Sequence, residues 1–238
     1  MNTYIERDDR ARKAAVAMKW IYVLSGVLIA IAGAMAGNMY RCFMGLVSLL
    51  VVPALAGIYR FFRLKPGWQL EIWVYVFAYL SITLGGCVDL YQKIHGFDKI
   101  AHMLSGAFTA LLAFALYLYL ERERPIQNLS AVTATFFVFF ASMAVAALFE
   151  IGEFALAPIV GRDLQRVIGT GVTDTIVDMI VCLVGTVCVL PLIMRFFRGK
   201  RDLFTDAAVS FYYKNMQHEG EPMPTEKCMK CRSCLYPE

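Results

Sequence analysis

Charged residues are scarce in this chain: Asp, Glu, Lys and Arg make up 18% of its 238 residues, hydrophobic residues make up 59%, and histidine occurs three times. Soluble domains carry about 25% charged residues, so this composition argues against an ordinary soluble domain. The sequence also lacks a glycine-rich phosphate loop, a Gly-x-Ser-x-Gly elbow and a His-Glu-x-x-His motif, and so gives no sign of the enzyme classes built on them. With a mean hydropathy of +0.57, the chain is expected to be a polytopic membrane protein.

Six apolar stretches are long enough to cross a bilayer core, which is about 30 Å thick and takes about 20 helical residues. They predict an all-α, polytopic membrane helix bundle with six transmembrane helices. We therefore divide the chain into a basic N-terminal segment (1–17), a transmembrane domain (18–197) and a C-terminal tail (198–238). The predicted spans are Met18–Ala36, Phe43–Phe62, Gln69–Leu90, Ile100–Leu120, Leu129–Ala157 and Val172–Phe197.

Lys and Arg are concentrated in alternate connecting segments: before the first span, between the second and third, between the fourth and fifth, and after the sixth. Because such residues favour the cytoplasmic side, both termini are predicted to be cytoplasmic. No basic face remains once these anchoring charges are assigned, so no nucleic-acid partner is expected. The first apolar run ends at Ala34-Met35-Ala36, which imitates a signal-peptide cleavage site. A signal usually has only about 7 to 15 apolar residues, which favours an uncleaved span over a cleaved signal.

Seven ionisable side chains lie near the ends of the predicted spans, and the predicted topology places all of them at the outer leaflet. A charged side chain in the bilayer centre costs roughly 2.5 to 3.5 kcal/mol on insertion scales, so the group calls for a ligand, protons or a water-filled cavity. Six of the seven form pairs spaced i,i+3 or i,i+4, which puts each pair on one helical face. The residues are Asp89, Asp98, His102, Glu150, Glu153, Asp174 and Asp178.

Neighbouring carboxylates raise one another's pKa and need shared protons or a compensating cation. One imidazole with several carboxylates suits Mg²⁺, Mn²⁺, Ca²⁺ or Fe²⁺, and also a catalytic Zn²⁺. For Asp98 and Asp174, each near the start of a helix, a capping role is equally open. We predict a divalent metal site in which these two residues act as general base or orienting groups. The predicted metal ligands are His102, Glu150, Glu153 and Asp178.

The loop before the sixth span carries Arg162 and Arg166. Beside a metal, two arginines can hold a phosphate through charge-assisted bidentate contacts, so they are predicted to bind a phosphorylated substrate. The alternative is that they neutralise the acidic site or contact anionic lipid headgroups.

The C-terminal tail ends in a Cys-x-x-Cys-x-x-Cys run. Cys228, Cys231 and Cys234 offer three thiolates, and His218 is the candidate fourth ligand for zinc or an iron–sulfur cluster. Redox-sensitive free thiols are the alternative. Upstream of this run, the amphipathic stretch from Leu203 to Tyr213 is predicted to lie on the inner membrane surface.

Three motifs carry a family resemblance. They are Phe97-Asp98-Lys99-Ile-Ala-His102 followed by Gly106, Ala147-Leu148-Phe149-Glu150-Ile-Gly-Glu153, and Gly169-Thr170-Gly171 with Thr173-Asp174-Thr175-Ile-Val-Asp178-Met179. Over roughly residues 70 to 195 the chain resembles YjdF-type uncharacterised bacterial inner-membrane proteins, and more distantly VanZ-like proteins, which are tied to glycopeptide resistance. The resemblance implies a multi-pass protein of the bacterial cytoplasmic membrane, and brings no established activity with it.

These observations support three hypotheses of different classes. The leading one is a metal-dependent enzyme that acts on an envelope lipid or a lipid-linked headgroup, with membrane lipids as its surroundings and partners. The second is a cation- or proton-coupled transporter that uses the same carboxylates. Such sites usually lie near the midplane between repeated halves, whereas these residues lie near one face of a chain with no visible repeat. The third is a non-catalytic sensor or partner protein with the cysteine-rich tail as its output.

Overall fold

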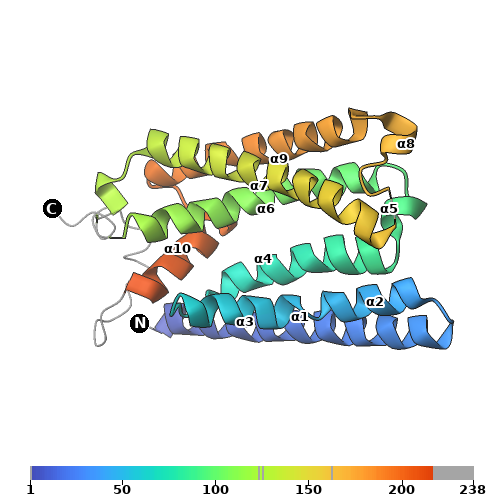
Figure 1. The fold of residues 1–238 in the computed structure, drawn as a ribbon. Coiled ribbons are helices and arrows are strands. Elements are labelled where there is room, and N and C mark those ends of the chain that lie inside the picture. Colours follow the sequence, from blue (N-terminus) through green and yellow to red (C-terminus); the bar gives the residue numbers. More distant parts are fainter. Residues whose placement is uncertain (1, 123, 125, 162, 217–238) are drawn as a thin grey trace.

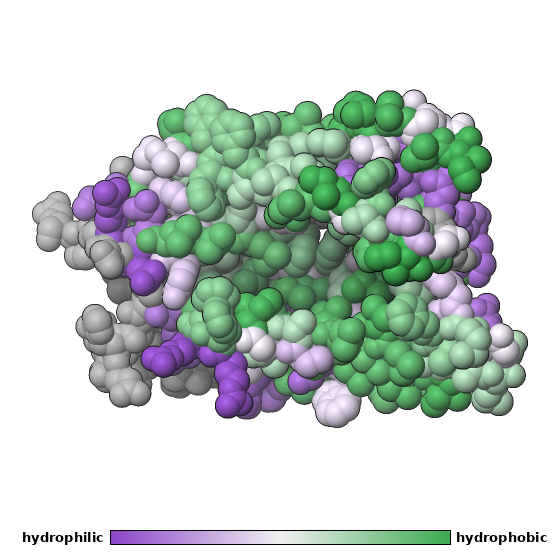
Figure 2. All heavy atoms as spheres, in the orientation of Figure 1, coloured by the Kyte–Doolittle hydropathy of each residue, from purple (hydrophilic) through white to green (hydrophobic). Residues whose placement is uncertain are grey.

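The protein is described by a computed structural model covering residues 2–122, 124, 126–161 and 163–216. The described chain is helical and contains six helices long and apolar enough to cross a membrane, which confirms the predicted bundle and its six spans. Figure 2 shows hydrophobic surface along the length of the bundle and hydrophilic residues gathered at its two ends, as expected for a membrane-spanning protein. The candidate spans are Asp8–Met35, Met39–Phe61, Trp68–Cys87, Phe97–Leu120, Ala131–Val160 and Thr173–Phe197.

The helices form two groups along the chain (Figure 1). In the first group, α1 (Asn2–Met35) packs against α2 (Met39–Ser48) and α4 (Trp68–Ala78), with α3 (Val51–Phe61) following α2. In the second, α6 (Phe97–Leu120), α7 (Ala131–Val160) and α9 (Thr173–Phe197) pack against one another, and α6 and α9 make the most extensive contact. The shorter elements α5 (Leu90–Lys93), η2 (Ile126–Asn128) and α8 (Val167–Thr170) connect them.

The second predicted span is broken in the middle, between α2 and α3. Leu49 and Leu50 form turns with hydrogen bonds to residues three positions earlier. Pro53 lies in the first turn of α3, where a backbone N–H is not needed. Inside a continuous helix, its missing N–H would leave the carbonyl oxygen four residues earlier without a hydrogen bond. The proline therefore explains why this span consists of two helices.

The third span changes its helical geometry toward its C-terminal end. After α4 the chain continues as a nine-residue π-helix, η1 (Tyr79–Cys87). π-Helical turns are rare and occur frequently at functional sites. Gly85 and Gly86 are buried in this element, and the ring of Tyr91 covers Gly85 so closely that a side chain there would overlap it.

Helix boundaries place the acidic residues at one end of the bundle. Gly96, with φ +82°, precedes α6 and puts Asp98 in its first turn, while Gly171, with φ +62°, precedes α9 and puts Asp174 in its first turn. Both glycines adopt the left-handed conformation that other residues rarely accept. At the same end, α7 stops at Gly161, so Glu150 and Glu153 lie in its final turns.

The last helix, α10 (Leu203–Met216), packs against α6, α4 and α9 at the opposite end (Figure 1). Its Ala207, Ala208 and Val209 are fully buried and share the main hydrophobic core with Phe114 of α6. Most apolar residues of α10 are thus covered by the bundle, while Leu203 is exposed. The hydrophobic core therefore continues past residue 198, and the position of this helix at the inner membrane surface stays a prediction.

Candidate functional site

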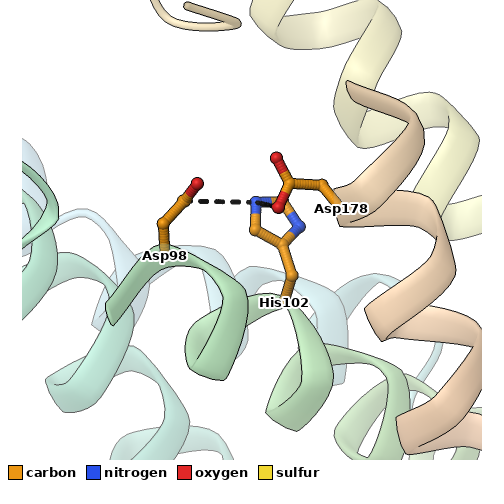
Figure 3. A group of neighbouring side chains, drawn as sticks. All are labelled: Asp98, His102 and Asp178. Carbon is orange, nitrogen blue, oxygen red and sulfur yellow. Dashed lines mark ion pairs between the residues drawn. The ribbon is translucent and has the colours of Figure 1, made fainter. Parts of the chain in front are cut away.

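The centre of the candidate site is a contact between α6 and α9. Asp98 and His102 come from α6 and Asp178 from α9, and their side chains point toward one another (Figure 3). His102 Nε2 lies 3.5 Å from Asp98 Oδ1 and 3.9 Å from Asp178 Oδ1. One ligand atom from each residue lies within 4.8 Å of the other two. His102 and Asp178 are buried, so this group of two carboxylates and one imidazole is largely shielded from solvent.

Lys99 supplies a cation to this group. Its Nζ lies 2.5 Å from Asp174 Oδ1, 2.8 Å from Asp178 Oδ1 and 3.3 Å from Asp98 Oδ2. Lys99 appeared in the sequence motif, but it was not predicted as a site residue. The clue was its position next to Asp98, in a stretch where a charge near hydrocarbon requires a partner. Its contacts link α6 to α9 and neutralise part of the acidic charge.

Arg166 is the second cation of the site. Its Nη1 lies 3.8 Å from Asp98 Oδ2 and 3.9 Å from Asp174 Oδ1, and its Nη2 donates a hydrogen bond of 2.9 Å to the backbone oxygen of Tyr91. These contacts favour the alternative reading of this loop, in which Arg166 neutralises the acidic residues. Arg166 also lines an open cavity of about 540 Å³, so part of its surroundings is accessible. Arg162 lies outside the described residues.

The two predicted glutamate ligands stand apart from the central group. Glu150 is buried, and its backbone and carboxylate oxygens accept hydrogen bonds of 3.1 and 3.4 Å from Gln165 Nε2. Glu153 acts electrostatically on Tyr91, next to the site. Burial raises the pKa of the Tyr91 hydroxyl far above its ordinary value, and the charges of Asp98 and Glu153 raise it further. Glu153 thus contributes to the electrostatic surroundings of the cluster, whereas Asp98 replaces both glutamates in the metal-compatible group.

Asp89 lies outside the central group of the candidate site. Asp89 has a left-handed backbone, with φ 67°, and lines a separate cavity beside Arg41 and Lys93. The proposed tail ligands, from His218 to Cys234, lie outside the described residues.

An apolar cavity of about 430 Å³ adjoins the cluster. Figure 2 shows the molecule hollowed between the two groups of helices. The cavity walls come from both groups of helices, namely α2, α4, η1, α5, α6, α7 and α9, and include Phe77, Phe108 and Phe149. His102 lines this cavity, and its ring meets that of Phe149 edge-on at 5.6 Å between centroids. The imidazole is therefore shared by an acidic cluster on one side and a hydrophobic cavity on the other.

A chain of small polar groups runs from His102 into the interior of the bundle. Ser105 Oγ lies 3.2 Å from Cys182 Sγ, and both groups donate to the backbone oxygen of His102. One turn deeper, the hydroxyls of Thr109, Ser142 and Thr186 follow one another at 2.6 and 2.8 Å. Beyond Thr186 the hydrophobic core around Phe114 and α10 fills most of the described interior, and the buried polar residues Thr205 and Ser210 belong to α10.

The comparisons with known proteins concern most of the membrane domain. Residues 15–199 match the model of the family described as "Predicted membrane protein (DUF2238)", the YjdF-type family. The more distant resemblance to VanZ-like proteins is not supported. No curated protein and no solved structure matches the chain. Because the match extends from the first span to the end of the sixth, the chain belongs to the DUF2238 family of membrane proteins.

Proposed function

We propose that this protein binds a divalent cation at Asp98, His102 and Asp178 and uses it on a lipid or lipid-linked substrate. The observation that carries the proposal is the position of His102, which lies in both the acidic cluster and the apolar cavity. A lipid with its apolar part in the cavity would present its polar part to the cluster. Binding sites of this kind combine an apolar wall with a few converging polar groups.

The charges of the site support a cation. Asp98, Asp174 and Asp178 contact two cations, Lys99 and Arg166, so one negative charge remains when the imidazole of His102 is neutral, as it must be to bind a metal, and before Glu150 and Glu153 are considered. Two carboxylate oxygens and one imidazole nitrogen are ligands that Zn²⁺, Mn²⁺ and Fe²⁺ accept, with positions left for water or substrate. In this scheme Asp98, His102 and Asp178 would hold the ion, which would supply Lewis acidity next to the polar part of the lipid. Asp174, held by Lys99, would orient that lysine.

Asp178→Asn tests the metal site with little structural disturbance. Lys99 keeps Asp174 as a partner at 2.5 Å, so the substitution does not leave a buried ammonium unpaired. We expect wild-type protein, reloaded separately with Zn²⁺, Mn²⁺ or Fe²⁺, to retain one of these ions stoichiometrically, and Asp178→Asn to lose it. The measurement is metal content by mass spectrometry together with thermal stability in detergent.

Glu121→Gln is the matched control, because Glu121 follows α6 at the opposite end and pairs with Arg124. Its metal content should equal that of the wild type. Wild-type protein that neither retains nor is stabilised by any of the three ions would refute the metal site. For the reaction, proteoliposomes containing bacterial envelope lipids should show a lipid product that depends on the added metal and on His102.

Proton-coupled transport is a second candidate, supported by the hydroxyl chain that leads inward from His102. The buried hydroxyls of Ser142 and Thr186 offer a path for protons over part of the bundle. The apolar core beyond Thr186 opposes a complete path. Decay of an imposed pH gradient in proteoliposomes, faster for the wild type than for Lys99→Gln and independent of metal, would favour this function over the enzyme.

A further inference from the structure

A second polar cavity, of about 250 Å³, lies between the start of α2 and the turn that leads into α5. Its walls include two cationic side chains, Arg41 and Lys93, and one carboxylate, Asp89. Its formal charge is therefore positive, in contrast with the acidic cluster of the candidate site. Arg41 lies in the first turn of α2, and Asp89 and Lys93 lie in and beside α5, at the end of the bundle where the acidic cluster also lies (Figure 1).

Arg41 lines this cavity, and one donor of its guanidinium is unpaired. The Nε is buried and has no hydrogen-bond partner among the described residues. The position of the residue is fixed by its backbone N–H, which donates 2.9 Å to the side chain of Asn38, the cap of α2. A buried donor without an acceptor is destabilising, and more so when the group is charged. An anion in the cavity would offset part of this cost through its attraction to the guanidinium charge.

Lys93 brings a second cation to the same cavity. Its Nζ donates a hydrogen bond of 2.6 Å to the backbone oxygen of Val88, which leads the side chain back over the turn. An ammonium has three donors, so this bond leaves two for a ligand. The turn itself requires the left-handed backbone of Asp89, which is costly for a residue other than glycine.

We propose that this cavity binds a phosphate-class anion, with Arg41 and Lys93 as its ligands. Arginine and lysine are the side chains that bind phosphate oxygens through charge-assisted hydrogen bonds. The phosphate can belong to a lipid headgroup or be free in solution, since the recognising chemistry is the same. The site neighbours the apolar cavity: Gly86 and Met44 line that cavity, while Cys87 and Arg41 line this one. The proposal does not depend on a metal at the acidic cluster.

The test measures binding of two probes to the full chain in detergent. Inorganic phosphate is titrated calorimetrically, and retention of phosphatidylglycerol against diacylglycerol, which lacks the phosphate, is measured by native mass spectrometry. Loss of a charged hydrogen bond corresponds to about tenfold or more in affinity. We expect a loss of this size in Arg41→Gln and Lys93→Gln, and a smaller one in Arg41→Lys, which keeps the charge. Arg60→Gln, in the last turn of α3, is the control and should bind as the wild type does.

The results separate the two sources of phosphate and the two proposals. Arg41-dependent binding of inorganic phosphate identifies a free-anion site, and Arg41-dependent binding of the lipid alone identifies a headgroup site. Lys93 is exposed, so Lys93→Gln should fold even if Arg41→Gln does not. Two outcomes would overturn the inference. In the first, both probes bind Lys93→Gln and a folded Arg41 variant as tightly as they bind the wild type. In the second, neither probe binds the wild type. Asp178→Asn should retain the anion, so a failed metal site leaves this result intact.

Discussion

The close contact of α6 and α9 is expected to control both the stability of the bundle and the geometry of the site. Gly106 of α6 faces the backbone of Cys182, and Gly185 of α9 faces the backbone of Met103. A Cβ on either glycine would overlap a carbonyl oxygen of the other helix. The two contacts are reciprocal, so Gly106→Ala and Gly185→Ala should each force the same two helices apart.

The structure gives the size of this effect. An added Cβ would lie 2.9 Å from the carbonyl carbon of Cys182 at Gly106, and 2.8 Å from that of Met103 at Gly185, whereas ordinary contact begins at 3.4 Å. The helices must therefore separate by at least about 0.5 Å, and by more to relieve the oxygen. Overpacking of this kind costs about 1 to 3 kcal/mol. For a chain of this size, each kcal/mol corresponds to a shift of about 2 to 4 °C in the melting temperature.

Thermal unfolding in detergent measures the effect, with Gly57→Ala as the control. Gly57 is also helical, but nothing lies within 4 Å of a Cβ added there, so helix propensity should make the change neutral or stabilising by up to about 1 kcal/mol. The double variant should lose less than the sum of the single losses, because the first substitution already separates the helices. Melting temperatures of Gly106→Ala and Gly185→Ala equal to that of Gly57→Ala would refute this account.

Three further outcomes are expected. A cysteine near Val160, in a background without native cysteines, should react with an impermeant thiol reagent in intact cells, and one at position 127 should not; the reverse pattern would contradict the predicted orientation. Lys214→Met should cost about 1.5 to 3 kcal/mol, because Lys214 pairs with Asp8 at 2.7 Å. Burial lowers the pKa of Lys214 below its ordinary value of 10.5. Just below pH 10.5 the unfolded chain therefore binds more protons than the folded one. In that pH range the stability of the wild type relative to Lys214→Met should rise with pH. Replacing the three tail cysteines with serine should leave the bundle folded and remove only tail-bound metal; a variant that fails to insert would make the tail structural.

The spans could be predicted from the sequence because hydrocarbon thickness sets their length directly. Their internal irregularities were less accessible. Pro53 was a visible signal for the break between α2 and α3, whereas the π-helical turn after α4 has no comparable signature in Tyr79–Cys87. The packing of α10 on the bundle could not be predicted for a physical reason: an apolar helical face can be buried by lipid or by protein, and the sequence of Leu203–Met216 does not distinguish them.

The site was partly predictable for a similar reason. Spacing along one helix correctly put Asp98 with His102, and Asp174 with Asp178, on common faces. Spacing does not determine how far each helix extends past its neighbour or how it rotates. Glu150 therefore fell outside the central group, and Asp98, expected as a base or orienting group, came within it. Whether these residues bind metal remains a prediction.

Lys99 changes how the excess of carboxylates should be understood. A cluster without cations would require protons or metal simply to exist near a membrane. Here Lys99 and Arg166 already hold α6, α9 and the preceding loop together, so the fold is not dependent on an added ion for its basic cohesion. The charge that remains, next to a histidine that faces an apolar cavity, is then available for a ligand. In the proposed function, structural and functional roles are divided among neighbouring residues, and substitutions such as Asp178→Asn, which leave Lys99 with its carboxylate partners Asp98 and Asp174, can separate them.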